Sequence, residues 1–182
     1  ELLHTTFDEI ERRYENKEPI TGLTTGFNDL NHKLNGFHAS DLILVAARPA
    51  MGKSAFALNL AQNAAMKGDA SVAIFSLEMS KEEVGNRILS SQALVNSAHL
   101  RTGALSNEDW TKISKALPLL YNTEIYVDDR SGTNVVEMLS KCRQLKLEGR
   151  LGLVIVDYLQ LMSSANSKNE SRQQEISEIS RS

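Results

Sequence analysis

The sequence predicts an α/β fold in which helices cover both faces of a mostly parallel sheet. Short apolar runs, each long enough for one buried strand, alternate along the chain with segments of helical periodicity. Two of these runs are followed by residue types that often bind phosphate or metal, and parallel sheets bind ligands at the carboxyl ends of their strands. A chain of 182 residues with 41% hydrophobic and 24% charged residues can form one domain and an appendage.

The first apolar run, residues 42–46, is predicted to be a buried strand. A tight loop ending in Gly52-Lys53-Ser54 follows it, and residues 55–61 have the pattern of a helix. Strand, loop and helix in this order are the context of a phosphate-binding P-loop, where backbone N–H groups converge on an anion. The residues predicted to bind the nucleotide are Arg48, Pro49, Ala50, Met51, Gly52, Lys53, Ser54 and Ala55.

Two side chains of this loop have predicted roles. Lys53 is expected to reach the outer phosphates, and the Ser54 hydroxyl is expected to ligate Mg²⁺. The loop departs from the usual pattern at Ala47, where the consensus begins with glycine. A methyl group is acceptable there if the φ angle of Ala47 is negative.

A second buried strand is predicted at residues 72–77, and it ends at Glu78. Residues 80–83 (Ser-Lys-Glu-Glu) have the spacing of a capping box and are expected to open the next helix. Glu78 lies at the carboxyl end of the strand, so two roles are open from its position. It is either an acid that caps the following helix or a general base that polarises the attacking water.

The next predicted helix begins at residues 106–110 and is expected to stop near Pro118. Its Trp110 is expected to pack in the core rather than to stack on nucleic-acid bases. Residues 125–128 are predicted to form a third strand, and residues 128–130 (Asp-Asp-Arg) a solvated turn. These elements supply the sheet and its covering helices, without further predicted site residues.

Thr133 is expected to cap the helix that follows, and Cys142 lies on or near the apolar side of that helix. No activating partner for the thiol is apparent, so we expect it to be inert. A single cysteine excludes an intramolecular disulfide and fits a reducing compartment. The sequence has no apolar run of about 18 residues and no signal peptide, so a cytoplasmic protein without a membrane contact is expected.

Residues 151–157 (Leu-Gly-Leu-Val-Ile-Val-Asp) provide the second part that a P-loop site requires. A buried strand ending in Asp157 is predicted to place a carboxylate beside the Ser54 hydroxyl, where both hold hydrated Mg²⁺. The loop and this acidic strand end together predict a site for a nucleoside triphosphate with magnesium. The net charge of −3 gives no general attraction to nucleic acid, so any contact with DNA is expected to be local.

The segments outside these motifs allow weaker predictions. Residues 3–14 carry an apolar stripe at helical spacing, and such a helix could dock on its own domain or on a neighbouring subunit. Thr25 is expected to cap a short helix that Gly36 closes. Residues 163–171, rich in Ser and Asn, are expected to form a mobile loop at the phosphate-binding edge. The last helical pattern has no following strand, so a truncated domain is expected.

Three segments resemble consecutive motifs of the DnaB-type replicative DNA helicases: residues 47–56, residues 75–80 (Phe-Ser-Leu-Glu-Met-Ser) and residues 157–161 (Asp-Tyr-Leu-Gln-Leu). The likeness extends over essentially the whole chain, and the last two segments are far more specific than a P-loop. It implies a RecA-like ATPase domain over residues 19–182 that lacks its C-terminal part. It also implies that residues 1–18 are a linker helix and linker, with the helix docked on the adjacent subunit.

The resemblance implies an ATP- and Mg²⁺-dependent motor in a homohexameric ring that encircles single-stranded DNA and moves 5′ to 3′. Primase and a helicase loader are the implied partners. Lys53 and Ser54 then bind phosphate and Mg²⁺, Asp157 is the acidic metal-binding residue, and Glu78 activates water; Glu78, Lys53 and Asp157 are the implied catalytic residues. The collar domain, sensor glutamine, DNA-binding loop and arginine finger of the family lie outside this sequence, so we expect the chain alone to hydrolyse little ATP.

Two other classes of function share parts of this pattern. A RecA-like recombinase or an ATP-driven DNA-remodelling switch fits the P-loop, Glu78 and Asp157 equally well. The segments at residues 75–80 and 157–161 favour the helicase. A small-molecule kinase uses the same type of loop, but no acceptor pocket is readable in the sequence.

Overall fold

The structure is a computed structural model that describes residues 4, 11, 20–149 and 151–157. The chain divides into two compact units, residues 1–43 and residues 44–182, which are described separately. The loop predicted at 163–171 and the last helical segment lie outside the described residues, as does the linker predicted at residues 1–18 apart from residues 4 and 11. Among the described residues, no helix is both long enough and apolar enough to cross a membrane.

The first unit contains a short helix, α2 (Asn28–Leu34), and an antiparallel bridge between Leu23 and Phe37 joins the segments before and after this helix. The two sides of this bridge approach closely at Gly22 and Gly36. A Cβ atom on Gly22 would lie 2.5 Å from the carbonyl oxygen of Phe37, and one on Gly36 would lie 2.7 Å from the carbonyl carbon of Gly22. Glycine is therefore required at both positions, because any side chain would clash with the opposite backbone.

Thr25 does not cap α2, so that prediction is wrong. The N-cap residue is Phe27, which has no side-chain cap. The Thr25 hydroxyl instead donates to Oδ1 of Asn31 at 2.7 Å and accepts the N–H of Phe27 at 3.2 Å. Thr25 is fully buried, so its hydroxyl needs these partners and ties the turn before the helix to the middle of α2.

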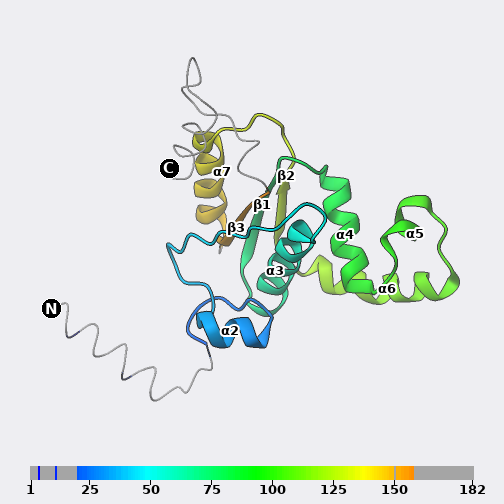
Figure 1. Ribbon diagram of the computed structural model, residues 1–182, viewed down its shortest axis with the longest axis horizontal. Coiled ribbons are helices and arrows are strands. Elements are labelled where there is room, and N and C mark those ends of the chain that lie inside the picture. Colours follow the sequence, from blue (N-terminus) through cyan, green and yellow to red (C-terminus); the bar gives the residue numbers. More distant parts are fainter. Residues whose placement is uncertain (1–3, 5–10, 12–19, 150, 158–182) are drawn as a thin grey trace. The chain divides into compact units, whose positions relative to one another are not determined.

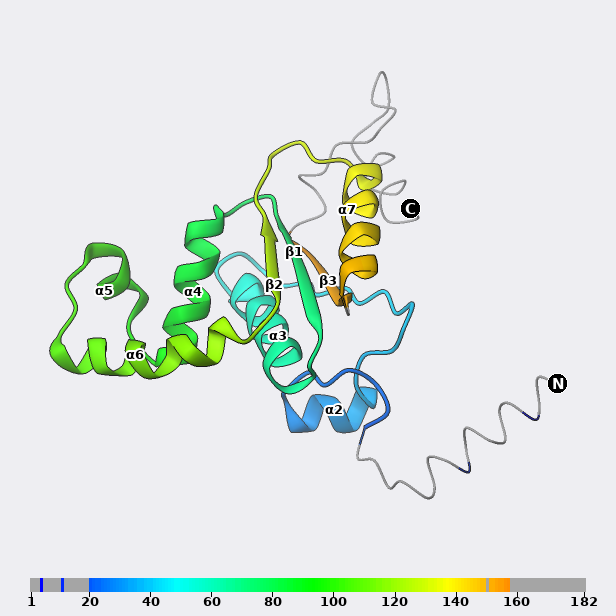
Figure 2. The same cartoon turned by 180° about the vertical axis from the view of Figure 1, so that it is seen from behind.

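The second unit is built on a three-stranded parallel sheet, with β1 (Ser71–Ser76) between β2 (Ile125–Asp128) and β3 (Leu151–Asp157) (Figures 1 and 2). The strands predicted at residues 72–77, 125–128 and 151–157 are confirmed. All six residues of β1 are buried, as expected for the central strand. Phe75 pairs with both Asp128 and Val156, so the carboxyl ends of the three strands meet at one edge of the sheet.

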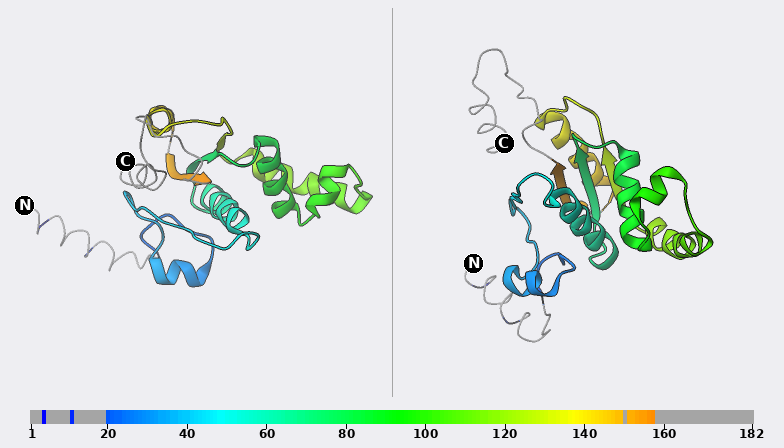
Figure 3. Two further views of the ribbon diagram at one scale, coloured as in Figure 1. Left: turned by 45° about the horizontal axis from the view of Figure 1, so that its top comes forward. Right: turned by 45° about the vertical axis from the view of Figure 1, so that its right-hand side comes forward.

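Helices cover both faces of this sheet, which confirms the predicted α/β class. Helices α3 (Lys53–Lys67) and α7 (Val135–Glu148) lie on opposite faces (Figure 3). The side chain of Met138 on α7 packs with Ala73 and Phe75 of β1. Helix α4 (Lys81–Ala93) follows β1, and a separate apolar cluster joins its end to α6 (Asn107–Tyr121), with the short α5 (Ser97–Thr102) between them.

The strand predicted at residues 42–46 is not formed. These residues have no regular secondary structure, and Leu42 and Leu44 are 72% and 70% exposed. A strand is buried only where neighbouring strands accept and donate its backbone hydrogen bonds. None of the three described strands pairs with this segment, so its apolar side chains stay exposed.

Two predictions for α6 are also wrong. The helix continues through Pro118 to Tyr121. Pro118 removes only one backbone hydrogen bond, near the end of the helix, and the burial of Ile113 and Ala116 holds the helix in place. Trp110 is 56% exposed rather than packed in the core. It lies in the first turn of α6, before the residues that join the apolar cluster.

The cap of α7 lies one residue later than predicted. Oδ1 of Asn134 accepts the N–H of Glu137 at 3.0 Å, whereas Thr133 is buried and donates its hydroxyl to the carbonyl of Arg130. Cys142 is half-buried against the cluster around Ala73 and Phe75. Burial raises the pKa of its thiol, which supports the prediction that this cysteine is inert.

Candidate nucleotide-binding site

The loop before α3 turns tightly, and two of its residues have a positive φ angle. Gly52 is the N-cap of α3 with φ of 86°, and Ala50 also has a positive φ, of 63°. Ala47 is not among the described residues with positive φ, so the condition for an alanine at this position is met. The first N–H groups of a helix have no acceptor within the helix and can bind an anion. The N-terminus of α3 therefore provides such donors directly after the loop.

The structure brings this loop to the acidic end of β3. Nζ of Lys53 lies 2.8 Å from Oδ1 of Asp157, and the Asp157 side chain is only 8% exposed. Ser54, the predicted metal ligand, is the next residue of α3. The predicted phosphate ligand and the predicted metal-binding acid are therefore in direct contact at the carboxyl edge of the sheet.

One oxygen of Asp157 can still accept a hydrogen bond or ligate a cation. Oδ2 is buried and has no hydrogen-bond partner among the described residues, while Oδ1 pairs with Lys53. Buried carboxylate oxygens normally have a partner, and hard cations such as Mg²⁺ prefer oxygen ligands. The orphaned Oδ2 atom, with the Ser54 hydroxyl on the adjoining helix, fits a magnesium site.

Glu78 lies in the turn between β1 and α4, next to the same edge. Ser76 pairs with Asp157 in the sheet, and the N–H of Leu77 donates to the backbone oxygen of Asp157 at 2.8 Å. The Glu78 side chain is exposed. Helix α4 is capped by Ser80, whose hydroxyl accepts the N–H of Glu83. The predicted opening of α4 is confirmed, and the alternative role of Glu78 as its cap is wrong; its role as general base stays a prediction.

Two aspartates at the end of β2 have partners that sequence reasoning missed. Asp128 pairs with Lys141 of α7 and with Arg130, whose Nε lies 3.1 Å away. Oδ2 of Asp129 accepts the backbone N–H of Lys81, the first residue of α4, at 3.0 Å. This hydrogen bond, and to a lesser degree the charge of Lys81, lowers the pKa of Asp129. The turn is partly exposed, as predicted, but both carboxylates also have partners within the fold, which the sequence did not indicate.

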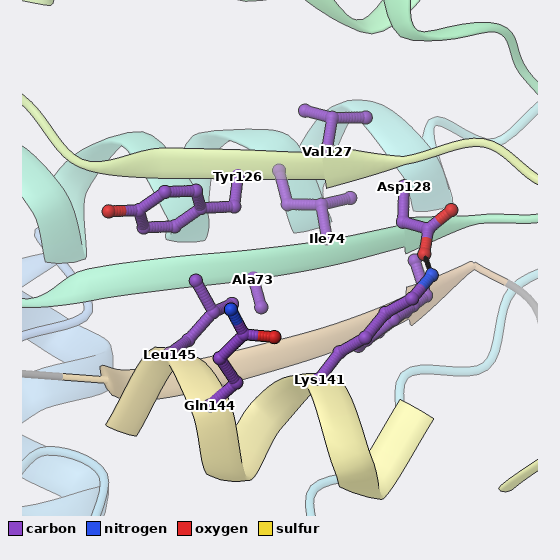
Figure 4. A pocket seen from close by; sticks show the side chains of 9 residues that line it. Ala73, Ile74, Tyr126, Val127, Asp128, Lys141, Gln144 and Leu145 are labelled. Atoms are coloured by element: carbon purple, nitrogen blue, oxygen red, sulfur yellow. Dashed lines mark hydrogen bonds and ion pairs between the residues drawn. The ribbon is translucent and has the colours of Figure 1, made fainter. Parts of the chain in front are cut away.

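A separate hollow of about 190 Å³ lies on the face of the sheet that α7 covers (Figure 4). Tyr126 and Asp128 line it from β2, and Lys141, Gln144 and Leu145 line it from α7. None of the predicted nucleotide-binding or catalytic residues lines this hollow. The candidate site is thus the carboxyl edge of the sheet and not this depression.

Comparison with known proteins assigns the chain to a family. Residues 22–182 match the family model of the DnaB-like helicase C terminal domain. The chain is 50% identical over 181 residues to the replicative DNA helicase DnaC of Bacillus subtilis and 48% identical over 182 residues to the replicative DNA helicase DnaB of Geobacillus stearothermophilus. Both matches cover 100% of this chain and 40% of the relative, so the chain spans about two fifths of their length.

Solved structures give the same result for the fold. The solved structure of an ATPase domain matches with a TM-score of 0.91 and 36% identity, over 99% of this chain and 63% of that one. A DnaB-like replicative helicase, studied with its interactions with primase, matches with a TM-score of 0.87 and 37% identity, over 98% of this chain and 42% of that one. These likenesses confirm the RecA-like α/β fold predicted from the sequence.

Proposed function

The chain belongs to the family of DnaB-like helicase C-terminal domains, and on this premise we propose that it is the ATP-driven motor of a replicative DNA helicase. ATP hydrolysis would drive 5′ to 3′ translocation on single-stranded DNA and unwinding of the duplex, within a hexameric ring. Residues 19–182 would form the ATPase domain and residues 1–18 the linker to the neighbouring subunit. The contact between Lys53 and Asp157 is the main structural support, because it joins the two halves of an ATPase site.

Lys53 is the residue we assign to the outer phosphates of ATP. Its ammonium group now holds the Asp157 carboxylate, and a phosphate oxygen can replace that carboxylate because both are anionic acceptors. The exchange would release Oδ1 of Asp157 beside the orphaned Oδ2. Ser54 and Asp157 are the residues we assign to Mg²⁺, which neutralises phosphate charge when it is bound with the nucleotide.

Glu78 is the residue we assign as general base. It would accept a proton from the water whose oxygen attacks the γ-phosphorus, while the bond to the bridging oxygen breaks and ADP leaves. General-base catalysis contributes roughly 10²–10⁴-fold to a rate. Its place in the turn after β1, one residue after the backbone bond to Asp157, supports this role.

A helicase motor of this kind also needs binding partners. Single-stranded DNA is the track, and further copies of the chain complete a homohexamer. The related helicase structure concerns interactions with primase, so we propose primase as a partner here, together with a helicase loader. A replicative motor acts on the chromosome, and we therefore place the protein in the cytoplasm without a membrane contact.

An unwinding assay tests this function. The full-length protein is incubated with ATP, Mg²⁺ and a forked DNA duplex, and release of the displaced strand is measured. The proposal predicts release that requires ATP and a 5′ single-stranded arm. Strand exchange between homologous DNAs without unwinding would instead identify a recombinase, and ATP-dependent remodelling without either activity would identify a switch.

A further inference from the structure

The turn that carries Glu78 is held at several points by hydrogen bonds. On its N-terminal side, the N–H of Leu77 donates to the backbone oxygen of Asp157 at 2.8 Å. Within the turn, the Ser76 hydroxyl donates to the carbonyl of Met79 at 2.7 Å and accepts the N–H of Met79 at 3.3 Å. Both Ser76 and Met79 are buried. The backbone on either side of Glu78 is therefore fixed to the core of the sheet.

The C-terminal side of the turn is held from a different strand. Lys81 is the first residue of α4, and its N–H donates to Oδ2 of Asp129 at 3.0 Å. Asp129 directly follows β2, so its carboxylate ties the end of β2 to the start of α4. Asp129 thereby links that strand end to a backbone position three residues after Glu78.

We propose that Asp129 is a positioning residue for the water-activating carboxylate of Glu78. This inference rests on the proposed function, because it assigns a role at the same ATPase site. The Asp129 carboxylate binds the N–H of the first residue of α4, which lies three residues after Glu78. Displacing a catalytic group by about 1 Å can cost about 100-fold in rate. Loss of the Asp129 carboxylate should therefore reduce turnover without removing any group that contacts the nucleotide.

A purely structural role must be distinguished from positioning, since a carboxylate at a helix N-terminus also stabilises the helix. The chain offers a matched control in Asp109, whose Oδ2 accepts the N–H of Ser106 at 3.0 Å at the start of α6. Like Asp129, Asp109 accepts a backbone N–H at the start of a helix, and it also pairs with His99 at 3.5 Å; its helix does not adjoin the Glu78 turn. Asp109→Ala therefore reproduces the loss of a helix-capping aspartate without touching the catalytic turn.

The experiment measures steady-state ATP hydrolysis and thermal unfolding of the full-length protein. Asp129→Ala should lower kcat about 10- to 100-fold with KM for ATP changed less than about threefold. Asp129→Asn keeps a side-chain oxygen that accepts the Lys81 N–H, and it should recover most of the kcat. Asp109→Ala should lower the melting temperature to a similar extent as Asp129→Ala, yet leave kcat unchanged.

A double variant separates this inference from the function on which it rests. Once Glu78→Gln has removed the base, adding Asp129→Ala should have no further effect, because groups that act as a unit are not additive. The role of Asp129 would be overturned if Asp129→Ala had the wild-type kcat, or if Asp129→Asn did not recover it. It would also be overturned if Asp129→Ala lowered kcat by the same factor in the Glu78→Gln background as in the wild type. Normal turnover by Glu78→Gln alone would instead overturn the proposed function of Glu78.

Discussion

The ammonium group of Lys53 lies 2.8 Å from Oδ1 of Asp157, although the two residues belong to different elements of the fold. Lys53 begins α3, and Asp157 ends β3. The contact shows that the predicted phosphate-binding loop and the acidic strand end occupy the same edge of a parallel sheet, which is the arrangement that a P-loop ATPase needs. The other oxygen of Asp157 is buried without a partner among the described residues, so it can ligate a cation.

Replacing Lys53 with alanine tests the loop. We expect Lys53→Ala to lower the affinity for Mg-ATP about 10- to 100-fold, because a charge-assisted hydrogen bond to phosphate is worth about 1.5–3 kcal/mol. The free energy of unfolding should also fall, by about 1–3 kcal/mol, since the buried Asp157 carboxylate loses its partner. Titration with a fluorescent ATP analogue and urea unfolding measure the two effects. Lys67→Ala, at the far end of α3, is the control; equal affinity in both variants would contradict the assignment of Lys53.

Replacing Glu78 with glutamine tests the general base. We expect Glu78→Gln to bind ATP as the wild type does while kcat falls by about 10²–10⁴-fold, because the amide cannot accept the proton of the attacking water. Release of inorganic phosphate measures the rate, and nucleotide titration measures the affinity. Glu82→Gln changes an exposed glutamate in the first turn of α4 and should keep the wild-type rate. A Glu78→Gln enzyme with normal turnover would remove this residue from the mechanism.

The capping aspartate of α6 predicts a pH dependence of stability. The pKa of Asp109 is below its ordinary value of 3.8, chiefly because the backbone N–H of Ser106 donates to its carboxylate. A lowered pKa in the folded state means that the ionised carboxylate stabilises the fold above pH 3.8, and that this stabilisation is lost as pH falls through the folded-state value. Urea unfolding should therefore show Asp109→Asn less stable than the wild type at pH 7. The difference should shrink below pH 3.8; a constant difference at all pH values would contradict the prediction.

The thiol of Cys142 predicts slow chemical modification. Burial raises its pKa above the ordinary value of 9.0, so little thiolate is present at neutral pH. We expect iodoacetamide to react at about pH 7.5 more slowly with the native protein than with the urea-unfolded chain. Mass spectrometry of the alkylated protein measures both rates. Equal rates in the two states would show that the thiol is neither buried nor perturbed.

Much of the fold was predictable because its signals are local. The strand ending in Asp157, the strand at residues 125–128 and the helix after Gly52 each follow from a short run of residue types that the structure confirms. Residues 42–46 have an equally apolar run, yet they form no strand, because a strand also needs a neighbour that the run itself does not encode. Local pattern therefore predicts a strand only where the pairing partner is present.

Contacts between distant segments account for the other differences. The bond from Lys81 to Asp129 joins the segments after two strands, and nothing near either residue in the sequence indicates it. Trp110 is exposed because the buried residues of α6 begin later, at Ile113, a boundary that periodicity does not give. The contact between Lys53 and Asp157 was more predictable than these features, since a P-loop and an acidic strand end must meet for their chemistry to work.

A crystal structure of the protein with Mg²⁺ and a non-hydrolysable ATP analogue is the sharpest test of the proposed nucleotide site. We expect Lys53 to leave Asp157 and bind the outer phosphates, and one Mg²⁺ ion to lie between the Ser54 hydroxyl and the Asp157 carboxylate. A nucleotide bound elsewhere, or bound while Lys53 still pairs with Asp157 and no metal lies near Ser54, would contradict it.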